Sequence, residues 1–100
     1  MLDTLTLDSF RPLVGSGFEL CEPDPAAQLI LIEAESLLGI REKGPAGFRE
    51  PFSLLFRGPA DLELPQQICR LRHADLGELA LFLVPLQPDR EGSYYEAVFT

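Results

Sequence analysis

His73 is the only histidine in the chain, and Asp75 follows it two residues later. An imidazole oriented by a carboxylate could act as a general base. The structural alternative is that His73 ends a strand and hydrogen-bonds into the turn after it. A lone histidine also leaves no second imidazole for a metal site. The pattern therefore favours a structural role for His73.

Cys69 stands four residues before His73, on the same face of a predicted strand. Along an extended chain the two residues would be about 13 Å apart, which is far beyond hydrogen-bond reach. A cysteine nucleophile activated by this histidine would need the strand prediction to be wrong. The serines show no nucleophile-elbow pattern that would provide another nucleophile.

Other fragments of binding motifs are incomplete. Gly15 and Gly17 resemble half of a phosphate-binding loop, but neither a lysine-serine pair nor a long helix follows them. Four aspartates are scattered between predicted turns rather than spaced as a calcium loop: Asp24, Asp61, Asp75 and Asp89. We therefore expect no cofactor, no metal ion and no enzymatic activity.

Arginines and tyrosines on the exposed side of the predicted sheet are the strongest candidates for binding. Arginine and tyrosine are enriched at the hot spots of protein interfaces. The candidate partner-binding residues are Arg57, Arg70, Arg72 and Tyr94. The structural alternative is that the three arginines form a solvated cross-strand ionic layer with glutamates. Those glutamates are Glu33, Glu35 and Glu96.

Charge and composition narrow the partners. The chain has 16 acidic and 8 basic side chains, and its net charge of -8 would repel phosphate backbones and anionic lipids. We therefore expect neither nucleic acid nor membrane as a partner. No apolar run approaches the roughly 20 residues that cross a bilayer, and the first residues lack the pattern of a signal peptide. Cys21 and Cys69 are predicted to be reduced thiols in strands, so the expected location is the cytoplasm.

Alternating apolar and polar residues predict six strands, separated by glycine- and proline-rich turns. The strands are expected at Phe18–Glu22, Gln28–Leu37, Phe52–Arg57, Ile68–His73, Leu79–Val84 and Tyr94–Thr100. Phe52, Leu54 and Phe56 should enter the core. A helix of one or two turns is predicted within Thr4–Val14, with Asp8 or Ser9 as its N-cap and with Phe10, Leu13 and Val14 on one face.

Connections between these strands are predicted as turns or loops. Pro23-Asp24-Pro25 and Pro88–Gly92 read as turns, and Leu38–Glu50 as a long surface loop that could bind a partner. Ala74–Glu78 is predicted to link two strands as a hairpin of about five residues. The strand that follows it is apolar on both sides and is expected to be central and covered on both faces.

This order of elements predicts one domain over residues 1–100 of the all-β class. The expected architecture is an antiparallel, six-stranded small barrel or sandwich with a short N-terminal helix. We favour the barrel, because about 100 residues rarely build two full sheets and closure hides strand edges.

Several runs are similar to an uncharacterised family of bacterial domains of about this length. They are Phe10–Gly15, Pro51–Pro59, Leu64–Gln66 and Tyr95–Phe99. The resemblance spans nearly the whole chain. It implies an accessory protein whose gene lies near those for phage tail-collar-like proteins, and it assigns no catalytic residue.

Three hypotheses follow for function. The first is a non-enzymatic protein-interaction or assembly module that serves a tail-like or adhesin-like partner. The second is a small barrel whose interior or mouth binds an apolar small molecule, with catalysis on that molecule as a variant of this hypothesis. A core packed solid with Phe52, Phe56, Phe82 and Phe99 would count against it. The third is a homodimer formed through Tyr94–Thr100 as an edge strand.

Overall fold

The computed structural model describes residues 5–22, 27–37 and 51–99. Two short helical segments precede six strands. The helical segments are α1 (Leu7–Phe10) and the 3-10 turn η2 (Arg11–Leu13). The strands are β1 (Gly17–Glu22), β2 (Gln28–Ser36), β3 (Phe52–Gly58), β4 (Gln67–His73), β5 (Gly77–Pro85) and β6 (Ser93–Phe99). The predicted turn Pro23-Asp24-Pro25, the loop Leu38–Glu50 and Thr100 lie outside the described residues.

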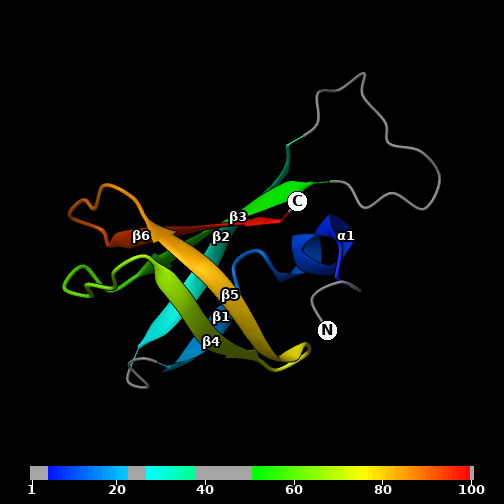
Figure 1. Ribbon diagram of the computed structural model, residues 1–100, viewed down its shortest axis with the longest axis horizontal. Coiled ribbons are helices and arrows are strands. Elements are labelled where there is room, and N and C mark those ends of the chain that lie inside the picture. The colour runs from blue at the N-terminus through cyan, green and yellow to red at the C-terminus, as the bar shows by residue number, and fades with distance from the viewer. Residues whose placement is uncertain (1–4, 23–26, 38–50, 100) are drawn as a thin grey trace.

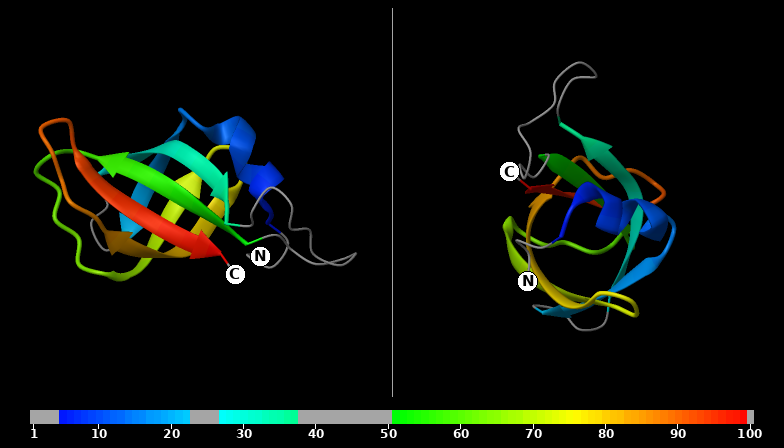
Figure 2. Two further views of the ribbon diagram at one scale, coloured as in Figure 1. Left: turned by 90° about the horizontal axis from the view of Figure 1, so that it is seen from above. Right: turned by 90° about the vertical axis from the view of Figure 1, so that its right-hand side faces the viewer.

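The six strands form a closed barrel in which every neighbouring pair is antiparallel (Figures 1 and 2). Their order around the barrel is β1-β2-β3-β6-β5-β4. The register shifts between Leu20 and Glu22 on β1 and between Leu31 and Glu33 on β2. Such bulges increase local bending and twist. The predicted all-β class, antiparallel pairing and short N-terminal helix are confirmed. Of the two predicted architectures, the structure is the barrel and not the sandwich.

Side chains alternate between the inside and the outside of the barrel along β3, β4 and β6. Phe52, Leu54 and Phe56 are fully buried, as predicted. Phe18 meets Phe56 edge-on, with ring centroids 5.3 Å apart. Both cysteines are free thiols, as predicted, and Cys69 is among the buried residues. The interior around these rings is therefore packed with side chains.

The N-terminal helical segment covers one end of the barrel (Figure 2). Phe10 is fully buried, and its ring lies 5.8 Å from that of Phe52 and 5.6 Å from that of Phe99. The predicted N-cap is wrong: Thr6 is the N-cap, and its backbone N–H donates to Ser9 Oγ at 3.0 Å. Val14 is exposed because the chain leaves the helical conformation before this residue and turns into β1.

β5 corrects another prediction. Its sequence suggests a strand covered on both faces, but the outer face is open, and Phe82 is 50% exposed instead of joining the core. The hairpin from β4 to β5 is a close variant of the prediction, since three residues separate His73 from Gly77. Gly77 has a φ of +75°, a conformation that L side chains rarely adopt, so glycine suits this turn.

β6 is not a free edge, as the dimer hypothesis assumed. It pairs with β3 along its whole length, from Phe52 opposite Phe99 to Gly58 opposite Ser93. On its other side it pairs with β5 where Val84 is opposite Glu96. Closure of the barrel therefore takes up the whole β3 side of this strand and, at Tyr95 and Glu96, its β5 side.

Candidate functional site

The four predicted partner-binding residues do not share one face of the barrel. Arg57 on β3 and Tyr94 on β6 are directly opposite each other. Arg70 and Arg72 lie on β4, and β3 and β4 are separated by two strands whichever way round the barrel is followed. The prediction of a single face is wrong. Alternation along a strand determines which side chains point into or out of the barrel, but it does not determine where around the barrel the strand lies.

The predicted ionic layer does not form around β4. Its glutamates lie on β2 and β6, whereas the neighbours of β4 are β1 and β5. They are Glu33, Glu35 and Glu96. Arg72 instead lies beside β1, with Nε 3.8 Å from the Glu19 carboxylate and a guanidinium N–H donating to Cys21 Sγ at 3.7 Å. The two charged side chains are more than half exposed, so this ion pair stabilises the fold only slightly.

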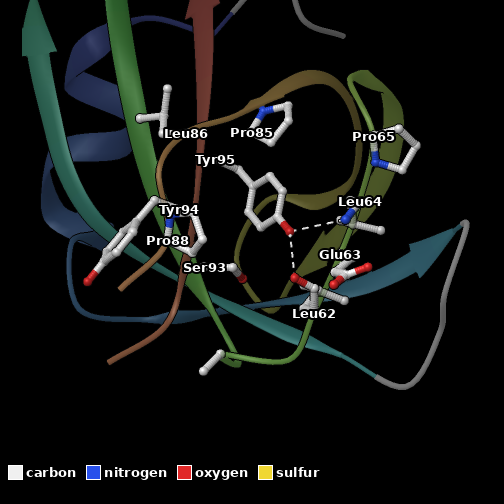
Figure 3. A pocket seen from close by; sticks show the side chains of 11 residues that line it. Leu62, Glu63, Leu64, Pro65, Pro85, Leu86, Pro88, Ser93, Tyr94 and Tyr95 are labelled. Carbon is white, nitrogen blue, oxygen red and sulfur yellow. Dashed lines mark hydrogen bonds between the residues drawn. The ribbon is translucent and has the colours of Figure 1, made fainter. Parts of the chain in front are cut away.

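A groove opens at the end of the barrel opposite α1. It lies between the connection from β3 to β4, residues 59–66, and the connection from β5 to β6, residues 86–92, and Figure 3 shows the side chains that line it. Its volume is about 450 Å³, within the range of ligand sites. Most of the lining is apolar, with leucines, two adjacent tyrosines and three prolines. The prolines are Pro65, Pro85 and Pro88.

Tyr95 holds one side of this groove in place. Its ring is buried, and its hydroxyl donates to the Leu62 carbonyl at 3.2 Å and accepts from the Leu64 N–H at 3.2 Å (Figure 3). Ser93, the first residue of β6, donates from Oγ to the Pro59 carbonyl at 2.9 Å. Three hydrogen bonds from β6 therefore fix the connection that follows β3.

Tyr94 and Asp89 hold the other side. The Tyr94 hydroxyl lies 3.0 Å from both Asp89 carboxylate oxygens, and Oδ1 also accepts the N–H of Glu91 at 2.8 Å and of Gly92 at 3.2 Å. The Glu91 N–H, followed by the Tyr94 hydroxyl, lowers the pKa of the Asp89 carboxyl. Desolvation, followed by the bond to Asp89, raises the pKa of the Tyr94 phenol. The predicted turn at Pro88–Gly92 is confirmed as a closed turn.

The two connections that form the groove are acidic. Glu63 lines the groove itself. Residues 59–66 and 86–92 carry four acidic side chains and one basic side chain: Asp61, Glu63, Asp89, Glu91 and Arg90. All five are exposed. The groove thus combines an apolar, aromatic wall with a surplus of negative charge at its rim.

His73 lies at the other end of the barrel and does not line the groove. Its Nδ1 accepts the Asp75 N–H at 3.0 Å, so the proton of the neutral ring is on Nε2. Nε2 lies 2.9 Å from Ser16 Oγ, and the Ser16 hydroxyl donates to the Leu13 carbonyl at 2.5 Å. Nε2 therefore donates to the serine rather than accepting its proton, an arrangement that supports the structural interpretation of His73.

Cys69 also has a structural setting. It is fully buried, and its thiol lies 3.9 Å from the Gln67 carbonyl, a long contact within β4. Burial raises the pKa of this thiol, which disfavours the nucleophilic thiolate. The arrangement around Cys69 gives no support to a cysteine-histidine pair.

Within residues 5–22, 27–37 and 51–99, no group of three or more His, Cys, Asp or Glu side chains is placed to hold a metal ion. In the same ranges, neither helical segment has the length and apolar character that a bilayer crossing requires.

Comparison with known proteins shows which family this chain belongs to. The sequence model of a family described as a domain of unknown function (DUF6916) matches residues 5–99. The chain belongs to this family. The match confirms the resemblance to a small domain of unknown function and spans every strand described above. Neither the curated proteins nor the solved structures gave a significant match.

Sequence reasoning selected Tyr94 but missed the rest of the groove. The signal that could have found it is the clustering of prolines and acidic residues in the two connections, which a six-stranded antiparallel barrel places at the same end. That argument needs the strand order, because the pairing of β3 with β6, together with that of β4 with β5, brings residues 59–66 beside residues 86–92.

Proposed function

We propose that this domain is a non-enzymatic protein-binding module that holds an extended peptide segment in the groove between residues 59–66 and 86–92. The observation that carries this proposal is the preformed wall of prolines, leucines and tyrosines. Aromatic-lined grooves are a recurring way to bind proline-rich segments, whose extended helix is already ordered before binding.

Rigidity of the groove supports this function. Tyr95 ties the connection at Leu62 and Leu64, and Tyr94 is tied to Asp89. The prolines in the wall have a fixed φ. A site that is already ordered loses little conformational entropy when it binds, which favours affinity.

Charge at the rim indicates the chemistry of the segment. Glu63 lines the groove, and the surrounding connections carry an excess of acidic side chains. Complementary charge speeds encounter and rejects partners of like charge. We therefore propose a proline- and leucine-containing segment that carries at least one arginine or lysine.

Fluorescence anisotropy with a labelled peptide tests this proposal. The probe is a ten-residue peptide of prolines and leucines with one arginine, compared with the same peptide carrying glutamate instead. The wild-type domain should bind the arginine peptide at least tenfold more tightly. Leu86→Lys, which puts a cation on an exposed groove residue, should weaken that binding by about tenfold.

Controls separate the groove from general charge effects. Val14→Lys adds the same charge at an exposed apolar position at the other end of the barrel and should leave affinity unchanged. Glu63→Lys should reverse the preference between the two peptides. Equal binding of both peptides by the wild type, or equal loss in the Val14 and Leu86 variants, would refute the proposed site.

A small apolar molecule is the second candidate for the same groove, since a volume of about 450 Å³ suits one. A ligand inside the barrel is less well supported: Phe18, Phe52 and Phe56 are fully buried in it, and His73 does not line the groove. Phe82, which the sequence placed in the core, lies outside. Saturation by an uncharged aromatic probe that displaces no peptide would favour this candidate.

The source of the peptide rests on the family resemblance alone. We propose that the peptide belongs to a component of a bacterial tail-like or adhesin-like assembly, and that the domain binds this component in the cytoplasm. The acidic composition supports a protein rather than nucleic acid or an anionic membrane as the partner.

A further inference from the structure

The outer face of β5 is apolar from Ala80 to Val84, after the outward Glu78. Its outward residues Ala80, Phe82 and Val84 alternate with the buried Leu79, Leu81 and Leu83. Strands of antiparallel sheets that face water on one side usually carry polar residues there. β5 therefore has the composition of a strand that is covered on both faces.

Neighbouring strands extend this face. Ile68 on β4 is directly opposite Phe82, and they are 68% and 50% exposed. The pairing of β5 with β6 ends where Val84 is opposite Glu96, so Val98 of β6, which is 53% exposed, lies two residues beyond that pairing. We call Ile68, Ala80, Phe82 and Val84 the apolar row. Single exposed apolar residues are ordinary, whereas a contiguous group of them indicates a docking surface.

None of the described elements covers this row. In Figure 1 β5 crosses the front of the barrel, and α1 lies at the barrel end instead. The composition of β5 thus suits a strand that is packed on both faces, whereas the described elements pack only on its inner face.

We propose that the apolar row docks against the same row of a second copy of this chain. A two-fold axis lying in the interface and passing by Phe82 would bring the two Phe82 rings together. This pairing buries the apolar face of both copies with a single self-complementary surface, as two-fold dimers do.

Charges beside the row fit this occupant. Arg70 lies opposite Ala80 on one side of Phe82, and Glu96 lies opposite Val84 on the other side. They therefore stand diagonally across Phe82, so the same two-fold axis can bring Arg70 of each copy to Glu96 of the other. A complementary pair on one surface suits a copy of that surface better than it suits a partner of one charge.

Sedimentation equilibrium of the whole chain over a range of concentrations tests this docking. The wild type should form dimers, and Phe82→Glu should raise the dimer dissociation constant about 30-fold or more, as expected for a central anchor. The control Val14→Glu adds the same charge at an exposed apolar residue of the barrel end and should dimerise as the wild type does. Circular dichroism should show the same far-ultraviolet spectrum for the wild type and for Phe82→Glu, and the same thermal midpoint at concentrations low enough for both to be monomeric.

Charge exchange gives a second test, independent of any effect of Phe82→Glu on folding. Arg70→Glu should weaken dimerisation about tenfold, and adding Glu96→Arg should restore it. A wild type that stays monomeric up to millimolar concentration would overturn the proposal, and so would dimerisation that neither Phe82→Glu nor Arg70→Glu weakens. Peptide binding in the groove should be unaffected by Phe82→Glu, so this proposal and the proposed function can fail separately.

Discussion

The Ser16 hydroxyl lies 2.9 Å from Nε2 of His73, although the two residues are 57 positions apart in the chain. Ser16 precedes β1, and His73 ends β4, so this hydrogen bond joins the N-terminal segment to the hairpin between β4 and β5. The His73 ring is buried and lies 4.6 Å from the Phe18 ring, between centroids. The histidine that the sequence offered as a candidate general base therefore has a structural role: it links these two segments.

His73→Leu should lower the free energy of unfolding by about 1–3 kcal/mol, because it leaves the Asp75 N–H and Ser16 without their partner. Chemical denaturation measures this. His73→Asn keeps a side-chain oxygen that can accept the Asp75 N–H, so it should lose less stability. Equal stability of the wild type and the leucine variant would contradict the structural role.

Tyr95→Phe should loosen the connection over residues 59–66. The variant keeps the buried ring but leaves the Leu64 N–H and the Leu62 carbonyl without the hydroxyl, at a cost of about 1–3 kcal/mol. Hydrogen exchange should show faster exchange of the Leu64 amide, with little change in the centre of β3. The groove should also bind its peptide more weakly, since it would no longer be preorganised. Unchanged protection of Leu64 would mean that the hydroxyl does not order this segment.

Asp89 should make the turn at residues 88–92 sensitive to acid. Its folded pKa is lowered by the Glu91 N–H and the Tyr94 hydroxyl, so its contribution to stability is full above the unfolded pKa and is lost as the pH falls through the folded pKa. Titration of the carboxyl carbon by NMR should show the lowered pKa directly. Asp89→Asn should remove this acid-dependent step while keeping an oxygen for the Glu91 N–H. A midpoint at the ordinary aspartate value would contradict the hydrogen-bonded arrangement.

Gly92→Ala should destabilise the fold by about 1–3 kcal/mol through overpacking. A Cβ at this position would lie 2.5 Å from the Gly58 carbonyl oxygen and 2.7 Å from Arg57 Cγ, and the carbonyl belongs to a paired strand that cannot easily move. Gly17→Ala is the matched control, because its new Cβ would meet only the end of the Gln28 side chain, which can rotate away. Thermal unfolding of both variants should therefore show a large shift for Gly92 and a small one for Gly17.

Much of the strand pattern could be predicted from the chain alone. The inward set on β3 was assigned correctly, and so was the split of β4 into outward Ile68 and Arg70 and inward Cys69. β5 was assigned less well, because an apolar run on both faces looks the same whether the second cover comes from this chain or from another molecule. The candidate site was only partly predicted, since Tyr94 lines the groove and the three arginines do not.

By itself the sequence determined that this chain is an acidic β domain whose strands alternate between a core face and an outer face. That pattern is local: successive side chains of an extended backbone point to opposite sides, whatever the rest of the chain does. Only the tertiary structure decided that β3 and β4 stand on opposite walls, that Ser16 meets His73, and that residues 59–66 and 86–92 form one groove. These relationships depend on strand order and barrel closure, which result from many pairings between segments distant in the sequence. The periodicity of a single segment carries no information about those pairings.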